Sequence, residues 1–234
     1  MNIAGLQKMT LLDYPGKVAC TVFLAGCNFR CPFCHNSGIL SAASPSDISR
    51  EELLRFLEKR KGLLDGVCIT GGEPTLQSDL PELLADIKGL GYPIKLDTNG
   101  TRPKMLKSLA EKGLIDYVAM DIKNSPHRYS QTVGCTADLQ ALEESIRFLL
   151  SGAVDYELRT TVVAELHSTE EILSMGQWLA SLSDSKPKRL FLQPYRDSEQ
   201  VLHPGMHAPD TAALEEFVRL LEPFVQQISL RGDV

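Results

Sequence analysis

Two kinds of hydrophobic pattern alternate along the chain. Short runs that are almost continuously apolar predict strands buried on both faces, as in a parallel sheet. Longer segments with apolar residues three or four positions apart predict amphipathic helices between those strands. The predicted strands are Val18–Leu24, Gly66–Thr70, Pro93–Asp97, Tyr117–Ile122, Tyr156–Val163 and Arg189–Pro194, with a short edge strand at Ile228–Arg231.

Several predicted helices have clear starts and ends. Ser49-Arg50-Glu51-Glu52 and Ser168-Thr169-Glu170-Glu171 each place a serine three residues before a glutamate, which predicts a capping box. Leucine-rich stripes over 83–90 and 139–150 each stop close to a glycine, and a last helix is predicted over Thr211–Leu221. This alternation predicts a single α/β domain with parallel strands. A six-stranded partial barrel and a doubly wound sheet both fit it.

Polar sequences follow most of the predicted strands. Because ligands bind at the carboxyl ends of strands in parallel α/β folds, we expect these sequences to form a site. They are the cysteine-rich loop 27–35, Gly71-Gly72-Glu73-Pro74, Asp97-Thr98-Asn99-Gly100, Asp121-Ile122-Lys123, Arg159 and Gln193-Pro194-Tyr195-Arg196.

The composition is that of an ordinary globular protein. The 234 residues are 43% hydrophobic and 23% charged, which excludes a disordered chain, a collagen-like repeat and a membrane bundle. With 24 Lys and Arg against 30 Asp and Glu, the net charge of −6 argues against nucleic acid as a partner. No apolar run is long enough to cross a membrane, and residues 1–8 lack the features of a secretory signal. We therefore expect a cytoplasmic protein.

Three of the six cysteines, Cys27, Cys31 and Cys34, lie in one loop, and four chemistries fit this loop. Cys31-Pro32-Phe33-Cys34-His35 matches a haem-attachment pattern, and its Cys-x-x-Cys part matches a thioredoxin-like redox pair, but both leave Cys27 without a role. A zinc site of three cysteines and His35 is a third possibility. The spacing favours the fourth, a 4Fe–4S cluster held by three thiolates, with one iron open to another ligand.

The loop, together with Gly71-Gly72-Glu73-Pro74, resembles the radical S-adenosylmethionine (SAM) superfamily. Four further segments resemble the glycyl-radical-enzyme activases of that superfamily, above all the activating proteins of anaerobic ribonucleoside-triphosphate reductase. The resemblance implies a single-domain partial (β/α)6 barrel, with the cluster loop after the first strand. The four segments are Leu12-Asp13-Tyr14-Pro15-Gly16, Cys34-His35-Asn36, Leu96-Asp97-Thr98-Asn99-Gly100 and Met120-Asp121-Ile122-Lys123.

The resemblance also implies cofactors and site residues. The cofactors are one 4Fe–4S cluster, ligated by Cys27, Cys31 and Cys34, and SAM, with a monovalent cation as a further candidate. The implied SAM contacts are as follows: Gly71, Gly72 and Glu73 for the amino group; Asp97 and Thr98 for the ribose and the cation; Asp121, Lys123 and Arg159 near the carboxylate, with Asp121 as the second candidate residue for the cation; and Phe33, His35 and Asn36 near the adenine.

The implied function is hydrogen abstraction from a glycine of a glycyl radical enzyme, with a low-potential donor such as flavodoxin or ferredoxin. Two alternatives stay open: a radical SAM enzyme acting on a small, purine-like molecule, and a non-catalytic iron–sulfur or zinc module. Cys20 and Cys68 fall inside predicted strands, so we expect them in the core, whereas Cys135 has no assigned role. Histidines 127, 167, 203 and 207 show no ligand spacing and are expected at the surface or in loops.

Overall fold

The structure is a computed structural model that describes residues 1–232. Two compact units can be distinguished. The first contains Met1–Asn28, Gly38–Thr98 and Arg102–Ala119, and the second contains Phe29–Ser37, Asn99–Thr101 and the residues from Met120 onward. That residues 1–234 form a single radical SAM domain stays a prediction.

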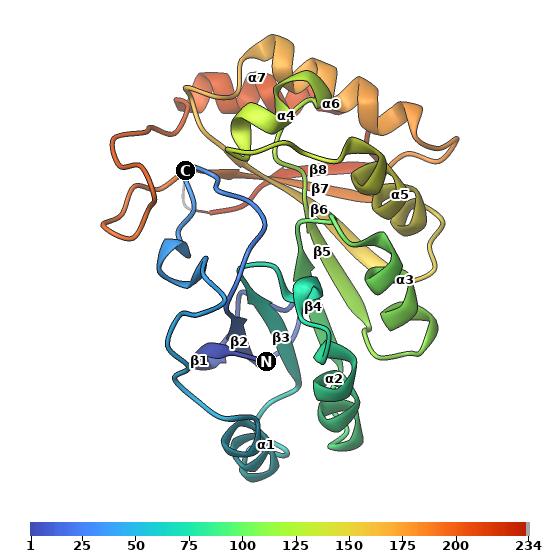
Figure 1. Cartoon of the computed structure of the whole chain (residues 1–234). Coiled ribbons are helices and arrows are strands. Elements are labelled where there is room, and N and C mark those ends of the chain that lie inside the picture. Colours follow the sequence, from blue (N-terminus) through green and yellow to red (C-terminus); the bar gives the residue numbers. More distant parts are fainter. Residues whose placement is uncertain (233–234) are drawn as a thin grey trace. The chain divides into compact units, whose positions relative to one another are not determined.

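Hydrogen-bonded strands follow one another in chain order from β1 to β8 (Figure 1). The strands are β1 (Ile3–Thr10), β2 (Ala19–Leu24), β3 (Gly66–Gly71), β4 (Ile94–Thr98), β5 (Tyr117–Asp121), β6 (Asp155–Val162), β7 (Arg189–Pro194) and β8 (Gln227–Leu230). The helices are α1 (Arg50–Lys59), α2 (Leu80–Gly89), α3 (Pro103–Glu111), α4 (Pro126–Thr132), α5 (Leu139–Leu150), α6 (Thr169–Ser181) and α7 (Thr211–Leu221), with single 3-10 turns at Ser37–Ile39 and Pro74–Leu76.

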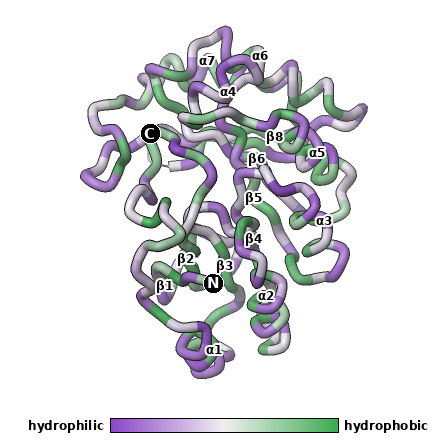
Figure 2. Tube along the Cα trace, in the orientation of Figure 1, coloured by the Kyte–Doolittle hydropathy of each residue, from purple (hydrophilic) through white to green (hydrophobic). Residues whose placement is uncertain are grey.

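In the first unit, β2 pairs in parallel with β3, and β3 with β4. β2 and β3 are in register from Ala19↔Gly66 to Leu24↔Gly71, so these two strands end side by side. Their central residues are fully buried, as the unbroken apolar runs predict. Figure 2 shows long hydrophobic stretches along the strands and alternating colours along the helices, which is the pattern of an α/β fold.

In the second unit, β6 pairs in parallel with β7, and β7 with β8. Helices α6 and α7 pack against each other beside these strands (Figure 1). All six strands predicted to be parallel are present, as is the short edge strand near the C-terminus. The predicted α/β fold with parallel strands is therefore confirmed.

One predicted feature of the topology needs correction. The chain begins with β1, which sequence analysis missed, and this strand runs antiparallel to β2. The cysteine loop therefore follows the second strand, which is the first of the parallel ones. Gln7, Lys8 and Met9 of β1 are exposed, so the strand lacks the apolar run by which the others were recognised.

The helix starts agree with the capping predictions, with one difference. At Ser49 the full capping box is present: its hydroxyl accepts from the Glu52 amide, and the Glu52 carboxylate accepts from the Ser49 amide at 2.9 Å. At Ser168 the hydroxyl accepts from the Glu171 amide, but the Glu171 carboxylate contacts Ser125 and His127 instead. Only the first half of the second box is therefore formed.

The Leu12–Gly16 segment forms a turn at the amino ends of the parallel strands. Tyr14 is 4% exposed, and its ring centroid lies 6.1 Å from that of Tyr117, the first residue of β5. It clusters with Tyr117 and with Ala19, the first residue of β2. Within the first unit, this segment therefore lies at the end of the strands opposite to Gly71 and Thr98.

Candidate functional site

None of the three loop cysteines belongs to a disulfide; Cys31 is buried, and Cys27 and Cys34 are half-buried. The Cys27 amide donates to the Leu40 carbonyl at 3.0 Å, which holds the start of the loop within the first unit. In the second unit, Cys31 is buried, and its carbonyl accepts from the Cys34 amide at 3.1 Å, so the last two cysteines lie on one turn. Burial raises the pKa of the Cys34 thiol, while Lys123 and Arg30 act in the opposite direction.

The backbone of the second half of the loop is held by two other segments of the second unit. The Arg30 amide donates to the Val133 carbonyl at 2.8 Å, and the His203 amide donates to the Pro32 carbonyl at 2.9 Å. A Cβ at Gly134 would lie 3.1 Å from the carbonyl carbon of Arg30 and closer still to its oxygen. The second half of the loop is therefore held in place by its main chain.

The Gly71-Gly72 pair is required by contacts within the chain itself. The Gly72 amide donates to the Leu24 carbonyl at 2.9 Å, and the Glu73 amide donates to the Gly26 carbonyl at 2.8 Å. A Cβ at Gly72 would lie 2.6 Å from the carbonyl carbon of Gly26 and closer still to its oxygen. The glycines thus let this turn pack directly on the chain just before Cys27, a role that sequence analysis did not identify.

Glu73 and Thr98, two predicted SAM contacts, meet in the first unit. Glu73 is fully buried, and its Oε1 accepts from the Thr98 hydroxyl at 2.8 Å and from the Thr75 amide at 3.0 Å. The second of these bonds caps the 3-10 turn that begins at Pro74. A buried carboxylate fixed by several donors is preorganised to receive a cationic group.

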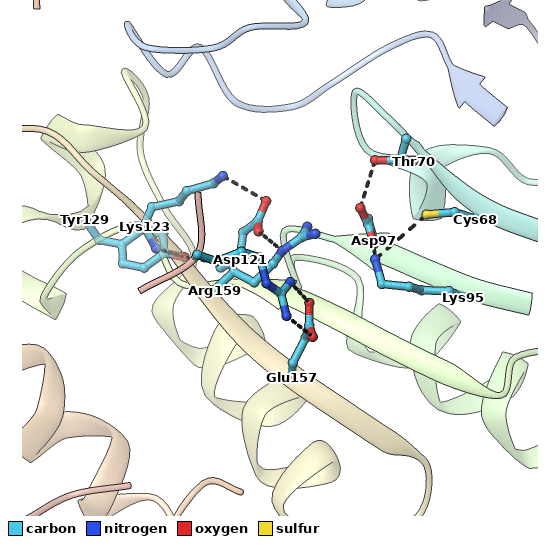
Figure 3. Close-up of polar contacts among 10 residues, drawn as sticks. Cys68, Thr70, Lys95, Asp97, Asp121, Lys123, Tyr129, Glu157 and Arg159 are labelled. Carbon is cyan, nitrogen blue, oxygen red and sulfur yellow. Dashed lines mark hydrogen bonds and ion pairs between the residues drawn. The ribbon is translucent and has the colours of Figure 1, made fainter. Parts of the chain in front are cut away.

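Asp97 is also paired within the first unit. Its Oδ1 forms an ion pair with the Lys95 ammonium, and its Oδ2 accepts from the Thr70 hydroxyl at 3.2 Å (Figure 3). Lys95 Nζ also lies 3.8 Å from Cys68 Sγ. Lys95 is only 1% exposed, and sequence analysis did not single it out.

In the second unit, the structure brings together three of the predicted site residues, Asp121, Lys123 and Arg159. Asp121 Oδ2 lies 3.0 Å from Lys123 Nζ, and its Oδ1 lies 2.9 Å from Arg159 Nε (Figure 3). Lys123 Nζ also lies 5.9 Å from the ring centroid of Phe33, another predicted contact. Burial opposes the ionisation of Asp121, but the charges of Arg159 and Lys123 outweigh it and lower its pKa to about 2.

The backbone of Lys123 lies just beyond the end of β5 and is held by two buried side chains. The Lys123 amide donates to the Tyr129 hydroxyl at 3.3 Å, and the Lys123 carbonyl lies 2.9 Å from His167 Nε2. His167 Nδ1 accepts from the Val163 amide at 3.0 Å, which assigns the proton to Nε2. His167 lies in the loop between β6 and α6, one of the two expected positions, but at 2% exposure it is not at the surface. Burial lowers its pKa, which favours the neutral ring.

His35 lies against a different part of the second unit. Its ring stacks on Tyr195 with centroids 5.6 Å apart, and its Nε2 lies 2.5 Å from the Arg196 carbonyl. Its neighbour Asn36 is half-buried. The structure thus places His35 beside the segment that follows β7, the last of the strand ends that sequence analysis singled out.

The remaining cysteines lie largely as expected. Cys20 and Cys68 are fully buried in strands, and burial raises the pKa of Cys20 to about 12. Cys135 is half-buried in the loop between α4 and α5. Within residues 1–232, no three His, Cys, Asp or Glu side chains converge so as to hold a single metal ion. No helix in this range has the length and apolarity needed to cross a membrane.

Comparison with known proteins links the chain to one superfamily. The sequence profile described as the Radical SAM superfamily matches residues 21–168. A protein of Methanocaldococcus jannaschii described as "Putative glycyl-radical enzyme activating enzyme" is 28% identical over 98% of this chain and 95% of its own length. The pyruvate formate-lyase-activating enzyme of Clostridium pasteurianum is 35% identical over 53% of this chain and 52% of its own length.

Solved structures share the fold. A domain of the pyruvate-formate lyase-activating enzyme of Bacteroides vulgatus matches with a TM-score of 0.59 and 19% identity, over 71% of this chain and 99% of that one. Streptococcus suis SuiB bound to S-adenosylmethionine matches with a TM-score of 0.70 and 15% identity, over 91% of this chain and 50% of that one. At these identities the structural likeness concerns the fold alone.

Proposed function

The chain belongs to the radical SAM superfamily, and on that premise we propose that it activates a glycyl radical enzyme, with anaerobic ribonucleoside-triphosphate reductase as the target. The observation that carries the proposal is the similarity to the Methanocaldococcus protein, which covers 98% of this chain and 95% of the relative. Matches to small-molecule enzymes cover less, as with the 7-carboxy-7-deazaguanine synthase of Hyperthermus butylicus, at 38% of each chain.

Members of this superfamily use a 4Fe–4S cluster and SAM, and the residues present fit both. Cys27, Cys31 and Cys34 supply three thiol donors in one loop, whose backbone is held by other parts of the chain. Three protein ligands would leave one iron of the cluster open to SAM. The bound cluster would supply one-electron reduction of the SAM sulfonium, the chemistry that yields a 5′-deoxyadenosyl radical able to remove a hydrogen atom from glycine.

The chain's own residues bind and orient SAM. Lys123 and Arg159 provide two cations for its carboxylate, and Asp121, which pairs with both, keeps them in place. Glu73 presents a buried, preorganised acceptor for its amino group. Phe33 lies beneath the Lys123 ammonium, where it limits access of water to that charge.

The proposed partners are a glycyl radical enzyme, which is the protein substrate, and a low-potential electron donor such as flavodoxin or ferredoxin. Both are cytoplasmic proteins, and we propose the same location for this chain. The positions of Cys20 and Cys68, each fully buried inside a strand, support a function without a second cluster.

The test begins with anaerobic reconstitution of the full chain, followed by addition of dithionite and SAM. We expect 5′-deoxyadenosine, and a glycyl radical signal in electron spin resonance when the reductase is present. Cys31→Ala should abolish both, whereas Cys135→Ala, which changes a cysteine outside the loop, should retain both. A clustered protein that forms no 5′-deoxyadenosine refutes radical chemistry. If 5′-deoxyadenosine forms but no glycyl radical enzyme of the same cell gains a signal, the small-molecule alternative replaces the activase.

A further inference from the structure

Strand β4 carries a buried lysine two residues before Asp97, one of the residues that the family resemblance connects with a monovalent cation. We propose that the Lys95 ammonium takes the place of that cation, so that SAM binding by this chain needs neither Na⁺ nor K⁺. Lys95 is then a positioning residue, which fixes the Asp97 carboxylate. The inference rests on the proposed function, because it concerns the same SAM site.

The first observation is that both oxygens of Asp97 are engaged by groups of the first unit. Alternate residues of a strand lie on one face, so Lys95 and Asp97 are neighbours on the same side of β4. The Lys95 ammonium pairs with Oδ1, and Thr70 of the adjacent strand donates to Oδ2 (Figure 3). A cation that bound the Asp97 carboxylate would therefore have to displace these two partners.

The second observation is the burial of the lysine. Its side chain is 1% exposed, and a buried ammonium is stable only beside a counter-charge. Besides Asp97, the ammonium contacts only Cys68 Sγ among the described residues, at 3.8 Å. Any cation that drew the Asp97 carboxylate away would leave the Lys95 charge buried without compensation, and the two positive charges would repel each other.

A third observation concerns the second unit. Asp121 is the other carboxylate connected with the cation, and its two oxygens lie 3.0 Å from Lys123 Nζ and 2.9 Å from Arg159 Nε. Both candidate cation ligands thus have covalently attached cations of the chain as partners. A lysine attached to the strand does not dissociate, so the charge at Asp97 is the same whatever the salt in the medium.

The experiment measures SAM affinity by equilibrium dialysis of the anaerobically reconstituted full chain. Three buffers of equal ionic strength are used, containing chloride salts of tetramethylammonium, Na⁺ or K⁺. The parent protein should bind SAM with the same dissociation constant in all three, within a factor of two. Lys95→Met should bind at least tenfold more weakly in tetramethylammonium and regain affinity in Na⁺ or K⁺.

Lys88→Met is the matched control. Lys88 also forms a lysine–aspartate ion pair, with Asp116 at 2.7 Å, but this pair is more exposed and lies at the amino end of β4, where Asp116 accepts from the Ile94 amide. This variant should behave like the parent in every buffer. Lys95→Arg keeps the charge and provides a second variant if the methionine protein does not fold.

The results distinguish failure of this inference from failure of the proposed function. Parent protein that binds SAM at least tenfold more tightly in Na⁺ or K⁺ than in tetramethylammonium overturns the inference, and this comparison needs no variant. Equal affinity of Lys95→Met in all three buffers overturns it as well. Clustered parent protein that binds no SAM in any buffer overturns the proposed function, and the inference with it.

Discussion

Replacing Gly72 with alanine should loosen the start of the cysteine loop. The new Cβ would lie 2.6 Å from the carbonyl carbon of Gly26, whereas real Cβ contacts essentially never fall below 3.0 Å. The two backbone segments would have to separate by at least about 0.4 Å, and more at the carbonyl oxygen. That oxygen accepts from the Glu73 amide at 2.8 Å, so the separation weakens the bond that joins the two motifs.

The expected cost follows from these two effects. Overpacking costs about 1–3 kcal/mol, and the weakened hydrogen bond adds roughly 0.5–1 kcal/mol. The free energy of unfolding should therefore fall by about 1.5–4 kcal/mol, which lowers Tm by roughly 3–16 °C in a chain of this size. Because Cys27 directly follows Gly26, the reconstituted variant should also hold less iron and sulfide per chain.

Circular dichroism of the metal-free protein measures Tm, and chemical analysis after reconstitution measures iron and sulfide. Gly89→Ala is the control, because Gly89 lies in α2 and a Cβ there would meet no atom within 4 Å. The control should be neutral or slightly stabilising, by up to about 1 kcal/mol. A Gly72→Ala protein with the Tm and iron content of the parent would refute the reasoning.

Three further predictions concern the second unit. Arg231→Leu removes the partner that donates to both oxygens of Glu157, at 2.6 and 2.8 Å. Because Glu157 is fully buried and Arg231 partly exposed, the free energy of unfolding measured in urea should fall by about 2–4 kcal/mol. His167→Asn should weaken SAM binding about tenfold in equilibrium dialysis, whereas His167→Gln, whose amide still reaches the Lys123 carbonyl, should weaken it less. The pKa of Asp121 is lowered from 3.8 to about 2, so its ionisation stabilises the fold above pH 3.8, and this contribution is lost as the pH falls toward 2; Asp121→Asn should flatten the decline of Tm over that range.

Each of these predictions has its own contrary result. Arg231→Leu combined with Glu157→Leu should recover most of the stability, so a double variant as unstable as the single one would contradict the role of the ion pair. Equal losses of SAM affinity in the two His167 variants would show that the bond to Lys123 has no special part. Parallel curves of Tm against pH for the parent and Asp121→Asn would contradict the lowered pKa.

The sequence predicted the parallel strands because burial on both faces leaves unbroken apolar runs, as in Val67–Ile69. It predicted the group around Asp121 because strand ends in such folds lie close together. It missed β1, whose exposed polar residues carry no such signal. For Gly72 the sequence analysis gave only a SAM contact. The backbone that approaches this glycine in the structure is that of Gly26, a contact that no local pattern encodes.

Lys95 and His167 were missed for a related reason. Each is a polar residue whose burial depends on a partner elsewhere in the chain: Lys95 on Asp97 and on strand β3, and His167 on the backbone of Lys123. A lysine in an apolar strand can equally reach solvent with its long side chain. Sequence periodicity indicates which positions are buried but not which partners they have. It therefore could not distinguish a buried, paired polar side chain from one that reaches solvent.

The turn around Tyr14 has a consequence for how variants of this protein are interpreted. It is one of the sequences that mark the chain as activase-like, yet within its unit it packs at the opposite end of the strands from Gly71 and Thr98. Damage there should appear as a poor yield of folded protein whose surviving molecules have normal kinetics. Damage at Lys123 should give the reverse, a good yield with impaired turnover, so a screen that scores activity per cell would confuse the two.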